Sequence, residues 1–128
     1  MSGVGKLDKT ILIVDPNELN TKLYRDLLVV QGHTVIATKD GTEALALTRQ
    51  HRPDLILSEA GLGGDITGLD LVRALKADAE LKSIPVIVAT SRAMKGDEER
   101  VRESGCDYFI AIPISVVHFL ETIERLLK

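Results

Sequence analysis

The chain has 128 residues, 45% of them hydrophobic and 27% charged, a composition typical of one soluble globular domain with a hydrophobic core. Its net charge of −3 and the lack of any block of lysine or arginine argue against nucleic-acid binding, which requires a concentrated basic face. The single cysteine, Cys106, excludes an intramolecular disulfide, and no apolar run approaches the roughly 20 residues of a membrane span. We therefore expect a cytoplasmic protein, with a flexible tail over residues 1–9 and one domain over residues 10–128.

Five short apolar segments alternate with helical patterns along the chain. The third and fourth segments are apolar at consecutive positions, as in strands that helices cover on both sides. The alternation predicts an α/β fold, in which a doubly wound parallel sheet of five strands carries helices on both faces. The expected strands are Thr10–Val14, Thr34–Thr38, Asp54–Ser58, Ile84–Thr90 and Tyr108–Ile112.

Helix signals fall between these strands. Gly32 stands where a C-terminal cap of the first helix belongs. Asp40 and Thr67 each precede a carboxylate by three residues, which predicts the starts of the second and third helices. The fourth helix is expected between Lys95 and Gly105, and Ser115 is expected to cap the last helix. Apolar residues at helical spacing define the first helix, namely Leu19, Leu23, Leu27 and Val30.

Polar side chains stand at several of the predicted strand ends. In an open parallel sheet, ligands bind at the carboxyl ends of the strands. The residues that close strands one, three, four and five are therefore candidates for a site, namely Asp15, Glu59, Thr90 and Ile112. Two acids and a hydroxyl group that converge in one crevice could hold a hard cation and a phosphate.

The same four residues also have purely structural interpretations. Asp15, followed by Pro16, has the pattern of an N-cap for the first helix. Glu59 could be a solvated loop acid, because exposed carboxylates are common. Thr90 could end a strand and satisfy a backbone group, and Ile112 could continue the apolar run of strand five. These interpretations predict no chemistry at the sheet edge.

Long stretches of the chain, from Thr10 to Leu127, are similar to two-component response regulator receiver domains. The segments that carry this resemblance are ILIVDPNELNTKL, DLILSEAGL, IPVIVATSRAMKGDEER and GCDYFIAIPISVVHFLETI. The resemblance implies the flavodoxin-like receiver fold, with strand order 2-1-3-4-5. It also implies a signalling domain rather than an enzyme, to which a histidine kinase passes phosphate on an aspartate that ends the third strand.

The chain departs from the receiver pattern at most of the positions that the resemblance assigns to phosphorylation. Asp15 matches the first acid of the magnesium-binding pair, but Pro16 replaces the second. Glu59 stands at the phospho-acceptor position with one extra carbon, and Ile112 replaces the family's lysine. Thr90 alone matches the phosphate-contacting side chains. The resemblance therefore implies a weak or lost magnesium site and no other cofactor, and the loop after Glu59 is one residue longer than in the family.

These departures predict a receiver that signals by binding. Losing one stabilising donor commonly costs on the order of 10²–10³ in rate, and a misplacement near 1 Å costs roughly 10²-fold. We expect negligible phosphotransfer to Glu59 and interpret its carboxylate as a fixed, partial mimic of a phosphorylated aspartate. The resemblance assigns a switch role to Thr90 and Phe109. It places the docking surface for histidine kinases or other signalling proteins on helix four, strand five and helix five of a monomer or weak homodimer.

Two alternatives stay open at this point. A working response regulator would still bind magnesium through Asp15 and Glu59, with water and backbone oxygens completing the site. A flavin or nucleotide binder would need a glycine-rich phosphate loop that opens a helix, and only the glycines between residues 61 and 64 cluster. With no lysine and no metal ion, the neighbouring charges of Asp15 and Glu59 should raise the pKa of at least one of these carboxyl groups or attract a cation. Arg92 is the nearest candidate in sequence, and a surface role for Arg92 is the alternative.

Overall fold

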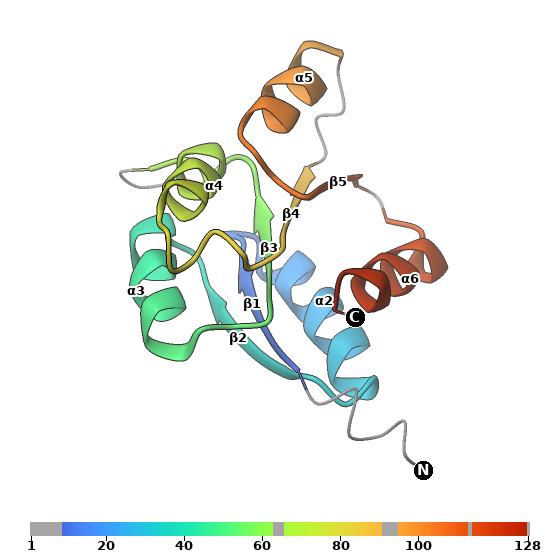
Figure 1. Ribbon diagram of the computed structural model, residues 1–128. Helices are drawn as coiled ribbons and strands as arrows, with labels where there is room; N and C mark the ends of the chain where they lie inside the picture. Colours follow the sequence, from blue (N-terminus) through green and yellow to red (C-terminus); the bar gives the residue numbers. More distant parts are fainter. Residues whose placement is uncertain (1–8, 63–65, 91–94, 113, 128) are drawn as a thin grey trace.

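The computed structural model of the protein describes residues 9–62, 66–90, 95–112 and 114–127. In these residues five strands alternate with five helices (Figure 1). The elements are β1 (Thr10–Val14), α2 (Glu18–Val30), β2 (Thr34–Thr38), α3 (Gly41–His51), β3 (Leu55–Glu59), α4 (Gly68–Ala77), β4 (Val86–Thr90), α5 (Lys95–Glu103), β5 (Tyr108–Ala111) and α6 (Val116–Leu127). The tail predicted for residues 1–9, apart from Lys9, and the cation predicted at Arg92 lie outside the described residues.

The strands form a parallel sheet in the order β2-β1-β3-β4-β5, which confirms the predicted fold class and topology. β1 lies inside the sheet, so that Ile11 is in register with Val35 on one side and with Leu55 on the other. β3 pairs with β4 through Ile56 and Val86. This order brings the carboxyl ends of β1, β3 and β4 to one edge of the sheet.

Alternate residues of the inner strands face opposite sides, so the sheet divides the core into two clusters. On one side, Leu12 and Val88 pack with residues of α3, α4 and α5. On the other side, Ile11 and Ile87 pack with residues of α2 and α6. Figure 1 shows α2 and α6 on one side of the sheet and α3 and α4 on the other. Burial on both faces explains why these strands are apolar at consecutive positions.

Most of the predicted helix termini are confirmed. The Asp40 side chain accepts a hydrogen bond from the amide of Thr42 at the start of α3. Thr67 and Asp70 form a reciprocal capping box at the start of α4. Gly32 follows α2 in the left-handed region, with φ of 93°, which a residue without a Cβ adopts readily. These signals are local in sequence and therefore predictable from it.

The start of α2 differs from the prediction. Asn17, not Asp15, is the N-cap, and its side chain accepts hydrogen bonds from the amides of Leu19 and Asn20. The predicted capping role of Asp15 is therefore wrong. Asp15 instead accepts a hydrogen bond from the amide of Asn17 at 2.8 Å, and its carboxylate lies at the carboxyl end of β1.

Of the four apolar residues whose spacing predicts α2, only Leu27 packs against the core, and it is partly buried. Leu19 is 79% exposed and Val30 is 83% exposed, whereas Tyr24 and Leu28 are buried. The Tyr24 ring stacks on Phe119 of α6, with ring centroids 5.4 Å apart. The helical period of the apolar residues predicts the helix. Because α2 carries apolar side chains on two sides, the period does not say which side is buried, and contact with α6 decides it.

Candidate functional site

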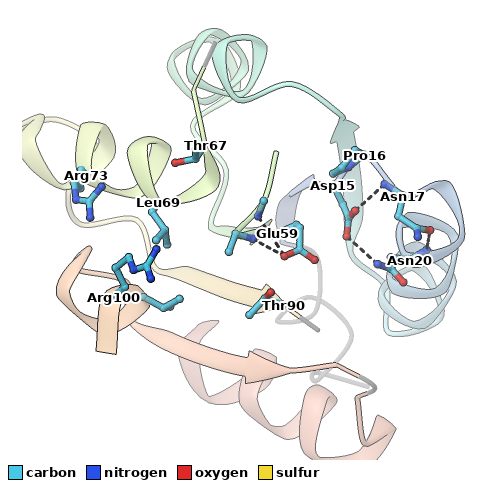
Figure 2. A pocket seen from close by; sticks show the side chains of 13 residues that line it. Asp15, Pro16, Asn17, Asn20, Glu59, Thr67, Leu69, Arg73, Thr90 and Arg100 are labelled. Carbon is cyan, nitrogen blue, oxygen red and sulfur yellow. Dashed lines mark hydrogen bonds between the residues drawn. The ribbon is translucent and has the colours of Figure 1, made fainter. Parts of the chain in front are cut away.

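A cleft of about 650 Å³ opens at the carboxyl edge of the sheet (Figure 2). The ends of β1, β3 and β4 form its floor, and residues of α2, α4 and α5 form its walls. Asp15, Glu59 and Thr90 all line this cleft. The fold therefore brings together three of the candidate residues that lie far apart in the sequence.

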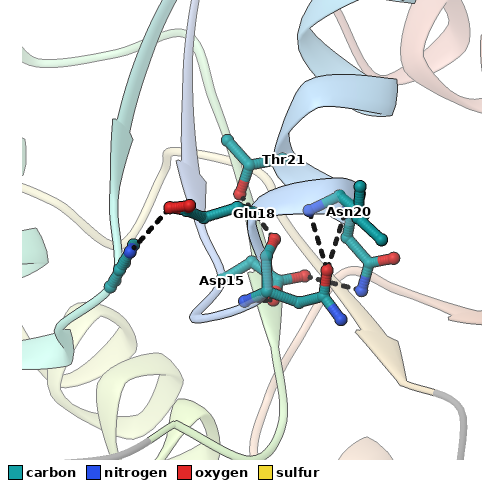
Figure 3. A network of polar contacts seen from close by, with 7 residues as sticks. Asp15, Glu18, Asn20 and Thr21 are labelled. Atoms are coloured by element: carbon teal, nitrogen blue, oxygen red, sulfur yellow. Dashed lines mark hydrogen bonds and ion pairs between the residues drawn. The ribbon is translucent and has the colours of Figure 1, made fainter.

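Asp15 is almost completely buried at the end of β1, with 3% of its surface exposed. One carboxylate oxygen accepts from the Asn17 amide at 2.8 Å and the other from the Asn20 side chain at 3.3 Å (Figure 3). Burial raises the pKa of Asp15, and these two hydrogen bonds partly oppose the rise. Pro16 lines the cleft beside it but offers no oxygen side chain.

Glu59 ends β3 and turns its carboxylate back onto its own loop. Its Oε1 accepts hydrogen bonds from the amides of Ala60 at 2.8 Å and Gly61 at 3.4 Å. Thr90 lines the cleft beside Glu59, and hydrogen bonding by its side chain lowers the pKa of this carboxyl group. Burial raises the pKa of Glu59, the three hydrogen bonds lower it and the negative charge of Asp15 raises it. The interpretation of Glu59 as a solvated loop acid is therefore wrong.

Gly68, which the sequence alone did not single out, fixes the loop that leaves β3. Its amide donates to the carbonyl oxygen of Ala60 at 2.9 Å. A Cβ at this position would lie 2.0 Å from the carbonyl oxygen of Glu59. Only glycine allows α4 to begin this close to the end of β3, so Gly68 helps to hold Glu59 in place. The signal in the sequence was its position directly after the Thr67 cap.

The residues present are a poor fit for a magnesium ion. Magnesium requires oxygen ligands in near-octahedral geometry. Each carboxylate oxygen of Asp15 already accepts one N–H hydrogen bond and so competes for a metal ion with only its second lone pair, and Pro16 supplies no side-chain oxygen. Among the residues that the structure describes, no group of three or more His, Cys, Asp or Glu side chains is arranged to hold a metal ion.

The two remaining predicted positions lie on and after β5. Phe109 is in register with Val88 and is partly buried against the cluster that α3, α4 and α5 cover. Ile112 is partly buried against the cluster on the α2 and α6 side. Its amide donates to the carbonyl oxygen of Thr90 at 3.0 Å, but its side chain packs against that cluster and is not among the residues that line the cleft.

Comparisons with known proteins agree with this architecture. The sequence model of the response regulator receiver domain family matches residues 11–124 of this chain. The chain belongs to the response regulator receiver family. The polar-differentiation response regulator DivK of Brucella anthropi is 51% identical over 121 residues, which cover 94% of this chain and 98% of that protein. The predicted resemblance is thus confirmed, and this receiver domain is DivK-like and part of two-component signalling.

Solved structures share the fold of this receiver domain. A putative response regulator from Chloroflexus aurantiacus has a TM-score of 0.89 at 22% identity, covering 94% of this chain and 98% of that chain. The receiver domain of a sensor histidine kinase from Pseudomonas aeruginosa, with magnesium coordinated in its active site cleft, has a TM-score of 0.86 at 25% identity, with the same coverage. In the described part of this receiver domain, no helix has the length and apolar character of a membrane span.

The raised pKa of Glu59 predicts a pH-dependent stability. Between the ordinary value of 4.5 and the raised value, the native receiver domain binds more protons than the unfolded chain, so stability falls as pH rises through this window and then levels off. We expect Glu59→Gln to flatten this slope, because the amide carries no charge to bury. Urea unfolding at several pH values measures how the free energy of unfolding depends on pH. Equal slopes for the native chain and for Glu59→Gln would contradict the prediction.

Proposed function

We propose that this receiver domain signals by binding two-component partners, with Glu59 as a permanent negative charge and without magnesium-dependent phosphorylation. The observation that carries the proposal is the hydrogen bonding of the Glu59 carboxylate, which accepts from the amides of Ala60 and Gly61 and from the Thr90 hydroxyl. By the family resemblance, the phosphoryl oxygens of a modified aspartate would contact the same threonine. The glutamate therefore takes up contacts that phosphorylation would otherwise create.

The charge of this arrangement supports a partial rather than a full mimic of phosphorylation. A glutamate carries about one negative charge, whereas a phosphorylated side chain carries about 1.5 to 2. The Thr90 hydroxyl is nevertheless engaged, which is the contact expected of the switch position. Phe109 is partly buried in the core beside it. We infer that the domain is held toward one signalling conformation without a phosphodonor.

The chemistry that phosphoryl transfer requires is poorly supported. Transfer depends on cations that offset the charge of the transferring oxygens. Ile112 replaces the lysine of the family, and Asp15 has both oxygens committed to N–H donors. The Oε1 atom of Glu59 already accepts from two amides, so attack through this oxygen competes with these hydrogen bonds. A binding role needs none of this chemistry.

The surface of this domain on which we propose that a partner docks includes the first turn of α6. By the family resemblance it lies on α5, β5 and α6. Among the residues that the structure describes, the large apolar side chains that are exposed lie on α2 and at the start of α6, namely Leu19, Leu23, Val29, Val30, Val116 and Val117. Exposed apolar side chains that gather on one face commonly mark interaction sites. We therefore extend the proposed histidine kinase contact from α6 onto α2.

The proposal is tested by incubating the native chain with magnesium and a small phosphodonor and reading intact mass. A thermal shift with beryllofluoride gives a second readout, because a ligand of the folded state raises stability. The matched control is the triple variant Pro16→Asp, Glu59→Asp, Ile112→Lys, which restores the family's acids and lysine. We expect only the control to gain the mass of a phosphoryl group and to be stabilised.

A response of the native chain would overturn the proposal. A mass gain on Glu59 or Asp15 would instead identify a working, magnesium-dependent response regulator with an unusual acceptor. The flavin-binding alternative makes a separate prediction, because a bound flavin would colour the purified protein yellow. Binding to a histidine kinase that does not change with magnesium would further support the proposed role.

A further inference from the structure

The cleft extends beyond the contact between Glu59 and Thr90 to a wall formed by α4 and α5. Arg73 of α4 and Arg100 of α5 line this wall. Figure 2 shows both arginines on the side of Glu59 that faces away from Asp15. The cleft is therefore polarised, with two carboxylates at the strand ends and two guanidinium groups on the helices.

The acidic end of the cleft is already supplied with hydrogen-bond donors. Asp15 accepts from the Asn17 amide and the Asn20 side chain, and Glu59 accepts from its own loop amides and Thr90. These carboxylates repel an anion, so a negatively charged group that enters the cleft is directed toward the arginines.

Arg73 is held only weakly at its present position. Its guanidinium lies 3.4 Å from an Asp70 oxygen, and both side chains are about half exposed. Exposed ion pairs at this spacing contribute little to stability. Asp70 also keeps its capping role without the arginine, because its other oxygen accepts from the Thr67 amide at 3.1 Å. Arg73 can therefore bind a ligand without disturbing the start of α4.

We propose that the arginine wall binds the phosphate group of a small phosphorylated molecule. Guanidinium groups match phosphate geometry, and the three terminal oxygens of a phosphate ester can engage arginines on two separate helices. A volume of about 650 Å³ lies in the range of small-molecule sites and exceeds what a phosphate alone needs. Leu69 and Val101 line the same cleft and offer apolar contact to the organic part of the ligand.

This site goes beyond the proposed signalling role and involves no covalent step. A phosphate bound by both arginines ties α4 to α5. The ligand's own hydrogen-bond donors then face Glu59 and Asp15. A small molecule could in this way adjust the position of α5, and hence the proposed docking surface, in a domain that receives no phosphoryl group.

Isothermal titration calorimetry with adenosine monophosphate and inorganic phosphate tests the site, with adenosine as the uncharged comparison. We expect both phosphates to bind and adenosine not to bind. Arg73→Gln and Arg100→Gln should each weaken binding by about tenfold or more, the loss typical of one charge-assisted hydrogen bond. Arg49→Gln is the matched control, because Arg49 is an exposed arginine of α3, 3.7 Å from Asp78, outside the cleft lining.

Two results would overturn the proposal. One is the absence of binding by both phosphates at millimolar concentration. The other is an equal loss of affinity in Arg49→Gln, which would show that phosphate binding depends on the overall charge of the protein and not on the cleft arginines. Neither result bears on the mass and thermal-shift test of phosphorylation, because that test depends on Asp15, Pro16, Glu59 and Ile112 and not on the arginines.

Discussion

Replacement of Gly68 by alanine is expected to destabilise the domain and to displace Glu59. The new Cβ would lie 2.0 Å from the carbonyl oxygen of Glu59 and 2.9 Å from the Cα and carbonyl oxygen of Ala60. All three atoms belong to the backbone, so no side-chain rotation can relieve the contact. Overpacking of this kind costs about 1–3 kcal/mol of unfolding free energy, and here the backbone itself must shift.

Urea unfolding of Gly68→Ala measures the loss of stability, and the chemical shifts of the Ala60 and Gly61 amides report the movement of Glu59. Gly61→Ala is the control in the same loop, because a Cβ at Gly61 would meet no atom within 4 Å. It should leave stability within about 0.5 kcal/mol of the native value. Equal stabilities for the two variants would contradict the role assigned to Gly68.

Replacement of Phe119 by alanine should have a still larger effect on stability. Phe119 is fully buried in α6 and stacks on Tyr24 of α2, with ring planes 25° apart. Removing a buried phenylalanine costs about 3–5 kcal/mol, because apolar burial is lost and a cavity remains. This is a large part of the roughly 5–15 kcal/mol that stabilises a typical domain. We therefore expect Phe119→Ala to unfold at a clearly lower temperature than the native chain.

Thermal unfolding followed by circular dichroism measures this loss. Val117→Ala provides the control on the same helix, because Val117 is 67% exposed and its truncation should change stability by less than about 0.5 kcal/mol. The same control tests the proposed docking surface, since Val117→Ala should weaken kinase binding while the fold stays intact. A Phe119→Ala variant as stable as Val117→Ala would show that the α2 and α6 contact is not a principal support of the fold.

The predictions that succeeded from sequence depend on local signals. Buried parallel strands are apolar at consecutive positions, and caps such as Asp40 and Thr67 need only residues within three positions. The family resemblance added the order of the strands. The prediction for the start of α2 failed because it considered only Asp15, whereas Asn17, two residues later, has the extended backbone of the N-cap and accepts from the amides of Leu19 and Asn20.

The sequence by itself determined the α/β fold and the membership of the receiver family, and it predicted Asp15, Glu59, Thr90 and Ile112 as candidate site residues. Only the tertiary structure decided which contacts these residues make. The Glu59 carboxylate turns onto its own loop amides because Gly68 holds that loop close to β3. Arg73 and Arg100 reach one cleft because α4 and α5 cover the same face of the sheet. The approach of Gly68 to Glu59 and the meeting of the two arginines involve residues distant in sequence, so no local pattern can encode them.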